Sequence, residues 1–187
     1  MEQADRDQER KPRGERKKPR KVSARYLENA ALHYLKRYAA TVTQLKRVLV
    51  RRVDRSVRVH GGERTEALKW VDELVEKLVR NGLINDSTYA GMKAHSLRAS
   101  GRSSRVIAQK LKLKGVSAEV VQQKVAEATA EVSEDAAALI WARKKHLGPY
   151  RKDLSTRKDN RQRDLAALAR AGFSFGVAKK IIDSEPE

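Results

Sequence analysis

Lysine and arginine are the residues whose type and spacing carry the clearest chemistry in this sequence. Arg102, Arg105, Gln109 and Lys112 are separated by three, four and three positions, a spacing that places side chains along one side of an α-helix. The segment from Lys93 to Ala118 holds seven Lys or Arg and no Asp or Glu. Cations that no neighbouring acid neutralises attract phosphates and carboxylates, so this helix is predicted to contact a polyanionic partner.

Two other segments share this excess of positive charge. Residues 36–58 hold eight Lys or Arg against one acid, and residues 143–163 hold nine against two. The whole chain carries a formal net charge of +18. This favours nucleic acid, a nucleoprotein or an acidic protein surface as the partner. The alternative is a solvated basic surface that binds no partner, and the uneven placement of the charge argues against it.

Signs of catalytic or cofactor chemistry are few. The sequence has no phosphate-loop pattern, no dinucleotide glycine fingerprint and no His-Glu zincin motif. A Ser-x-x-Lys match at 155–158 has no companion motif. Trp70 and Trp141 lie on apolar faces and are predicted to be core residues. No enzyme activity, cofactor or metal is therefore expected, and none of the four histidines has metal-like spacing: His33, His60, His95 and His146.

The compartment can be inferred from what the sequence lacks. It has no cysteine, so disulfides and thiolate metal sites are impossible. The longest purely apolar run, AAALIWA at 136–142, is too short to cross a bilayer. The highly charged N-terminus does not resemble a secretory signal. These features predict a cytoplasmic protein without membrane contact.

Helices must position the cations, because apolar residues recur at helical spacing throughout 25–183. Aromatic residues make up only 5% of the chain, so aliphatic cores between packed helices are expected. Asn85 or Asp86 is predicted to cap a helix, and Gly82 to end the helix before it. Residues 54–65 are predicted to be an irregular basic insertion, and 148–158 a basic loop.

An internal repeat organises these helices. Residues 111–125 and 168–182 share leucine, glycine, serine and valine at a constant offset of 57, although Asp164 stands where the first copy has Ile107. Leu45 and Leu49 occupy the corresponding places of Ile107 and Leu111 in an earlier unit. The predicted fold is therefore all-α, an elongated array of tandem three-helix modules. The predicted parts are a disordered basic arm at 1–22 and modules at 23–84, 85–132 and 133–187.

The stretch from Gly101 to Val121 also has the outline of a DNA-binding helix-turn-helix, with a glycine turn at Gly115 and a second helix opened by Ser117. The helix that would enter the DNA groove, 118–131, carries three glutamates and one lysine. The same motif also appears two or three times in a row. Direct DNA reading is therefore the alternative hypothesis, and a helical enzyme without a reactive constellation is the third.

Three segments carry a family resemblance: NGLINDSTYA at 81–90, RASGRSSRVIAQKLKLKGVS at 98–117 and ARAGFSFGVAKKII at 169–182. In this order they resemble RecX, the bacterial regulator of the RecA recombinase, over roughly 26–183. The sequence departs from the family pattern at Ser100 and Gln109, and in the 54–65 and 148–158 segments.

The resemblance implies a non-catalytic protein that binds RecA and the RecA–single-stranded DNA filament, with possible direct contact to DNA. A monomer is expected. Such proteins lie along the groove of the filament and inhibit strand exchange, ATP hydrolysis and coprotease activity. The candidate contact residues are the basic residues of the second helices and the loops leading into them: Arg47, Arg51, Arg98, Arg102, Arg105, Lys110, Lys112, Lys114, Arg161 and Arg163.

Overall fold

A computed structural model describes residues 18–185, and this part of the chain contains nine α-helices, two 3-10 turns and no strand. Residues 1–17 of the predicted arm lie outside the described residues. The α-helices are α1 (Ala24–Leu35), α2 (Val42–His60), α3 (Arg64–Arg80), α4 (Asp86–Ala99), α5 (Ser104–Leu113), α6 (Ala118–Glu131), α7 (Glu134–Lys145), α8 (Arg157–Arg170) and α9 (Phe175–Asp183). The 3-10 turns are η1 (Gly148–Tyr150) and η2 (Leu154–Thr156).

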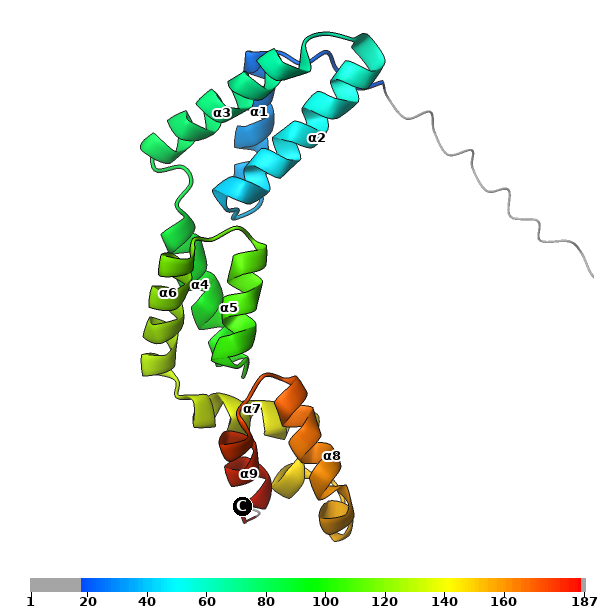
Figure 1. Ribbon diagram of the computed structural model, residues 1–187, viewed down its shortest axis with the longest axis vertical. Coiled ribbons are helices and arrows are strands. Elements are labelled where there is room, and N and C mark those ends of the chain that lie inside the picture. The colour runs from blue at the N-terminus through cyan, green and yellow to red at the C-terminus, as the bar shows by residue number, and fades with distance from the viewer. Residues whose placement is uncertain (1–17, 186–187) are drawn as a thin grey trace, which may run out of the picture.

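The described helices form three hydrophobic cores in succession. One core lies between α1, α2 and α3, the next between α4, α5 and α6, and the last between α7, α8 and α9. Figure 1 shows the three groups stacked end to end into a curved, elongated body. The prediction of an all-α array of three-helix modules is confirmed, and we call the groups the first, second and third modules. The proposed boundaries at 84/85 and 132/133 lie in the short segments between helices.

Capping residues explain where the helices begin. Asn85 accepts a hydrogen bond from the Thr88 N–H at 2.9 Å, as the sequence predicts for an N-cap. Ser117 caps α6 in the same way. Gly82, after α3, has a φ of 70°, the left-handed conformation that glycine adopts without steric cost.

The predicted insertion at 54–65 is wrong over most of its length, because α2 continues to His60. Val53 and Ser56 are buried, and Val57 packs against the core of the first module. The apolar face therefore extends two turns beyond the predicted end of the helix, which the many arginines on its other faces obscure. The irregular part shrinks to residues 61–63.

The last residues of the predicted arm contact the first module. The Val22 N–H donates to Ser56 Oγ at 2.8 Å, and His60 Nε2 lies 2.6 Å from the Pro19 carbonyl oxygen. Val22 is partly buried against the first core. Residues 18–22 therefore form an ordered strap across the end of α2, contrary to the prediction of disorder up to residue 22.

The repeat at an offset of 57 is present in the structure, and its main irregularity has a physical reason. Leu111 and Leu168 are both fully buried. Asp164, which replaces an isoleucine, is also buried and accepts hydrogen bonds from the Gly148 N–H at 2.8 Å and from both Nε and Nη2 of Arg151 at 2.8 and 2.7 Å. The carboxylate thus holds the start of the 148–158 segment, which carries the two 3-10 turns.

The first and second modules meet at a joint built from helix ends. The hydroxyl of Thr41, the N-cap of α2, donates to the Lys114 carbonyl oxygen at 2.6 Å. The N–H of Val42, the first residue of α2, donates to Asp86 Oδ1 at 2.9 Å. A Cβ on Gly115 would lie 2.2 Å from Thr43 Oγ1, so only glycine fits where the turn between α5 and α6 meets α2.

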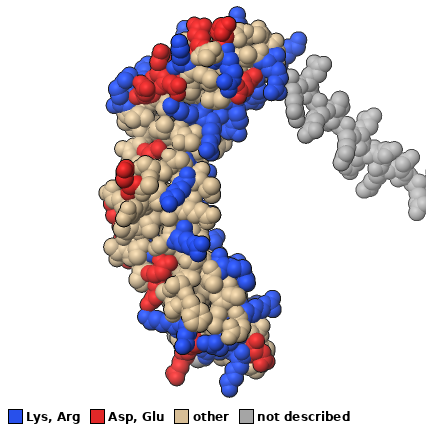
Figure 2. Space-filling model, viewed as in Figure 1, with Lys and Arg blue, Asp and Glu red and all other residues tan. Residues whose placement is uncertain are grey.

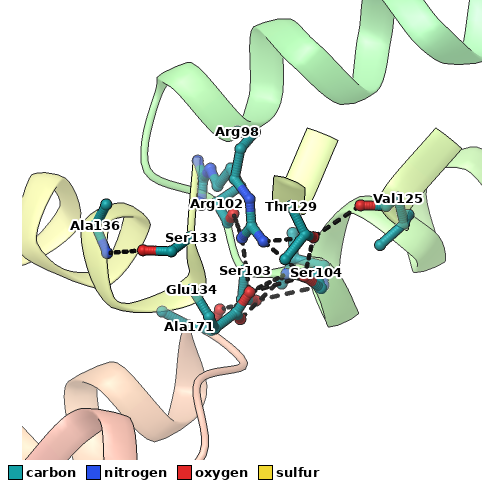
Figure 3. Close-up of polar contacts among 11 residues, drawn as sticks. Arg98, Arg102, Ser103, Ser104, Val125, Thr129, Ser133, Glu134, Ala136 and Ala171 are labelled. Atoms are coloured by element: carbon teal, nitrogen blue, oxygen red, sulfur yellow. Dashed lines mark hydrogen bonds and ion pairs between the residues drawn. The ribbon is translucent and has the colours of Figure 1, made fainter. Parts of the chain in front are cut away.

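The second and third modules meet through the same three kinds of contact as the first joint. The hydroxyl of Ser103, the N-cap of α5, donates to the Ala171 carbonyl oxygen at 2.7 Å. The N–H of Ser104 donates to Glu134 Oε1 at 3.2 Å, and Glu134, like Asp86, is the first residue of its helix (Figure 3). A Cβ on Gly172 would lie 2.5 Å from Ser103 Oγ. Each joint therefore pairs the N-terminus of a second helix with a carboxylate and a glycine turn of the next module, an arrangement that the helix dipole favours.

Candidate functional site

The second helices of the three modules share one side of the molecule. Figure 1 shows α2, α5 and α8 along the concave side of the curve, and Figure 2 shows Lys and Arg side chains gathered along that side. The repeated joints produce this alignment, because each fixes the start of one second helix against the next module. The second helices and many of the basic residues therefore share one side of the molecule (Figure 1 and Figure 2), but the ten candidate residues divide into groups with different surroundings.

Four candidates come together in a cleft across the first joint. Arg47 and Arg51 project from α2, and Lys110 and Lys114 from the end of α5, into a space of about 960 Å³. All four are exposed. Tyr34 and the apolar residues Val48, Val50 and Leu113 form further parts of the wall, and no acidic residue lines it. We call this space the inter-module cleft.

Two cations of the inter-module cleft are not among the ten candidate residues. Lys46, on α2, lines it but also forms an ion pair with Asp72 at 2.8 Å. Lys93 reaches it from α4, the first helix of the second module. Both residues lie within or at the edge of the basic segments 36–58 and 93–118, but only the joint brings α2, α4 and α5 together.

Two other candidates lie on a different flank of α5. Arg105 and Lys112 are exposed and border a shallow, largely apolar groove between α5 and α6, whose floor includes Val121 and Val125. Lys110 and Lys114 face the inter-module cleft instead. The cations of α5 therefore form two separate rows and not one.

The structure contradicts the prediction that Arg98 contacts a partner, because this residue lies inside the protein. Its side chain is 1% exposed, and its guanidinium donates to Glu134 at 2.7 Å, to Thr129 at 2.6 Å and to Ser104 at 2.9 Å (Figure 3). It also donates to the Arg102 carbonyl oxygen at 3.1 Å. Arg98 is therefore a structural residue of the second joint and is unavailable to a partner.

Arg102 and the α8 candidates are also engaged within the protein. Arg102 precedes α5 and stacks on Trp141, with its guanidinium carbon 4.2 Å from the ring centroid. Arg161 forms two 2.7 Å hydrogen bonds with Asp183, which raise the pKa of Arg161 and lower the pKa of Asp183. Only Arg163 is exposed with no ion pair recorded among residues 18–185. The third module therefore offers fewer uncommitted cations among the candidates than the first two.

The features needed for a helix-turn-helix that reads DNA are used for other contacts. The side chain of Thr43, from the first module, occupies the space beside Gly115 in the glycine turn. On α6, Glu127 accepts from Lys124 at 2.8 Å, and this hydrogen bond lowers the pKa of Glu127. The exposed face of α6 thus lacks the free cations that would enter a polyanionic groove.

Residues 18–185 hold no cluster of three or more His, Cys, Asp or Glu that could bind a metal ion. Within the same range, none of the helices has both the length and the apolar character needed to span a membrane.

Comparison with known proteins adds to these observations. The family model for the second three-helix domain of RecX matches residues 85–124. A curated Regulatory protein RecX of Myxococcus xanthus (strain DK1622) is 76% identical over 170 residues, which cover 91% of this chain and 91% of that protein. Another, from Agrobacterium fabrum (strain C58), is 30% identical over 157 residues, covering 84% and 82%. No solved structure matches the chain.

The matched model covers α4, α5 and the first half of α6. This range includes the buried Arg98 and the glycine turn at Gly115. The similarity to the Myxococcus protein extends over nearly the whole chain and so includes all three modules in large part. On this identity and coverage, the chain belongs to the RecX family of regulatory proteins.

Proposed function

We propose that this protein binds the RecA–single-stranded DNA filament with the concave side of its helical array and thereby inhibits RecA. The inhibited activities are strand exchange, ATP turnover and coprotease action. In this proposal the protein acts as a cytoplasmic monomer and hydrolyses no nucleotide itself. The single observation that supports it most is the inter-module cleft, where four of the ten candidate cations converge without a lining acid.

The shape of the protein supports the same proposal. A filament presents a long, helically repeating surface, and a curved array can follow such a surface over several subunits (Figure 1). Exposed lysines and arginines along the concave side provide attraction to DNA phosphates and to acidic protein surface. Inhibition follows because a molecule bound along the filament obstructs subunit addition or the DNA exchange that the filament catalyses.

The test compares two flanks of one helix. Lys110→Glu/Lys114→Glu reverses two charges in the inter-module cleft, and Arg105→Glu/Lys112→Glu reverses two charges beside the α5–α6 groove. We expect the first variant to need about tenfold more protein for half-inhibition of RecA ATP turnover on single-stranded DNA, because repulsion replaces attraction. The second should change inhibition less.

A further variant serves as the control for net charge. Lys69→Glu/Arg80→Glu makes the same change on exposed positions of α3, outside the cleft. Wild-type inhibition by the Lys110/Lys114 variant would contradict the cleft as the working surface, and unchanged RecA turnover with saturating wild-type protein would contradict the function. If Gln122→Glu/Gln123→Glu/Lys124→Glu instead abolishes sequence-specific duplex binding, the helix-turn-helix alternative is correct.

A further inference from the structure

A second group of cations lies where the strap of residues 18–22 crosses α2. Lys18 and Arg20 of the strap and Arg52 and Arg55 of α2 surround a hollow of about 540 Å³. The other lining residues are neutral or histidine: Pro19, Tyr26, Asn29, Ala30 and His33. Four cations around one hollow, with no acid in its lining, repel one another unless an anion enters.

The strap is held in place beside α2 on both sides of Arg20. Val22 donates to Ser56 Oγ, and the Pro19 carbonyl oxygen contacts His60 Nε2. These contacts fix Lys18 and Arg20 near the arginines of α2. The hollow is thus a product of tertiary structure between segments about 30 residues apart in the sequence.

Arg52 carries the second observation, a buried donor without an acceptor. One guanidinium nitrogen, Nη1, donates to the Tyr26 hydroxyl at 3.1 Å, but Nε is buried and has no partner among the described residues. Leaving a buried charged donor unpaired is unfavourable. The acid beside it in sequence, Asp54, is bound to Arg64 at 2.8 Å.

We propose that this hollow binds a phosphate group of a nucleic-acid strand. A phosphate supplies several acceptor oxygens for arginine forks and neutralises the surrounding cations. A strand is favoured over a free phosphate because Arg47, Arg51 and Arg55 form a row at four-residue spacing on α2. Arg55 donates through Nε to the Arg51 carbonyl oxygen, and Arg51 to that of Arg47, both at 3.2 Å, which orients the row. The row leads from the inter-module cleft to the hollow over about 12 Å of helix.

The experiment uses the full-length protein and no RecA, so its result is independent of the proposed function. Binding of a short labelled oligothymidylate is measured between about 50 and 200 mM salt. In Arg20→Gln/Arg55→Gln, two phosphate contacts are lost, so the slope of log affinity against log salt should become shallower by about 1.4. The dissociation constant at the lowest salt should rise severalfold. The matched control, Lys69→Gln/Arg80→Gln, removes the same charge from α3 and should behave as the wild type.

Competition with inorganic tripolyphosphate distinguishes a strand from free phosphate. Displacement of the oligonucleotide only at large excess supports the strand, whereas tight tripolyphosphate binding without oligonucleotide binding overturns it. Equal salt slopes in the wild type and the Arg20/Arg55 variant also overturn the proposal, as does a wild-type protein that binds neither probe. Arg52→Met, which removes the unpaired donor, should weaken oligonucleotide binding without lowering the melting temperature.

Discussion

Arg98 shows at the residue scale how charge in a sequence can serve structure. It lies in the basic segment 93–118, which holds no acid, yet its guanidinium is enclosed by Glu134, Thr129 and Ser104. A buried cation that is paired and hydrogen-bonded contributes to the choice of one arrangement over others, and it is costly to break. The second joint therefore depends on this residue more than on the exposed cations around it.

This leads to a prediction for Arg98→Met. The substitution keeps much of the apolar volume but leaves Glu134 without its cation, so the free energy of unfolding should fall by about 3 kcal/mol. Arg105→Met, at an exposed site, should change it by less than about 0.5 kcal/mol. Urea denaturation of both variants measures this. If the Arg98 variant keeps wild-type stability but lacks the RecA inhibition proposed for the wild type, Arg98 is a contact residue.

A second prediction concerns Asp164, whose carboxylate holds the Gly148 N–H and the Arg151 guanidinium. Asp164→Ala leaves both donors without this acceptor, which should lower stability by about 2 kcal/mol. Trypsin should then cleave faster after Arg151, because the 148–158 segment loses its anchor. Asp159→Ala, at an exposed position of the same helix, is the control. Equal cleavage rates in the two variants would show that the 148–158 segment stays ordered without the Asp164 carboxylate.

At the scale of the element, α2 and α5 make the same three kinds of contact at their N-termini. An N-cap hydroxyl, a first N–H and a glycine turn meet in both joints, although the residues involved differ. The joints are formed by helix ends and hydrogen bonds, while the apolar packing stays largely within each module. A turn that resembles a DNA-binding motif in sequence is therefore used here to attach one module to the next.

A comparison of two glycines tests the joint. Gly115 and Gly82 have φ values of 83° and 70°, so alanine strains the backbone at either position, by about 1–2 kcal/mol. Only Gly115→Ala places a Cβ against Thr43, because nothing lies within 4 Å of a Cβ at Gly82. We expect small-angle scattering to show a changed radius of gyration for Gly115→Ala alone. The same dimensions for both variants would show that the first joint absorbs the added methyl group.

At the scale of the whole molecule, the first and third modules are each completed by additional contacts at the ends of the array. The strap of residues 18–22 crosses the end of α2, and at the other end Arg157 donates to the carbonyl oxygens of Ile182 and Ser184. Terminal modules of helical arrays lack one neighbour, so contacts of this kind complete them. The strap thus belongs to the folded body.

Two truncations separate the strap from the residues before it. Removal of residues 1–17 should leave the melting temperature nearly unchanged, because the described contacts of the strap begin at Pro19. Removal of 1–22 should lower it, because Val22 leaves the first core and Ser56 loses its partner. Thermal melts followed by circular dichroism decide this. Identical melting temperatures for the two truncations would show that the strap does not stabilise the first module.

The sequence by itself determined the helical class, the repeated modules and the family. Helical periodicity, capping residues and glycine turns act over a few neighbouring positions, so they can be recognised without a structure. Ile107 and Leu111, which the repeat aligns with Leu45 and Leu49, have the spacing of an apolar helix face, and both are fully buried. The error at 54–65 arose because arginines on the outer faces of α2 interrupt its narrow apolar face in this part of the sequence.

Tertiary structure alone decided which cations remain free. Arg98, Arg105 and Lys110 lie close together in one basic segment, yet one is buried, one borders a groove and one faces the inter-module cleft. The acid that pairs with Arg98 and the opposite wall of the cleft beside Lys110 come from other modules, through joints that bring residues 30 to 73 positions apart into contact. Local spacing fixes the side of a helix on which a charge lies, but a carboxylate or a cleft reaches that side only when the modules pack.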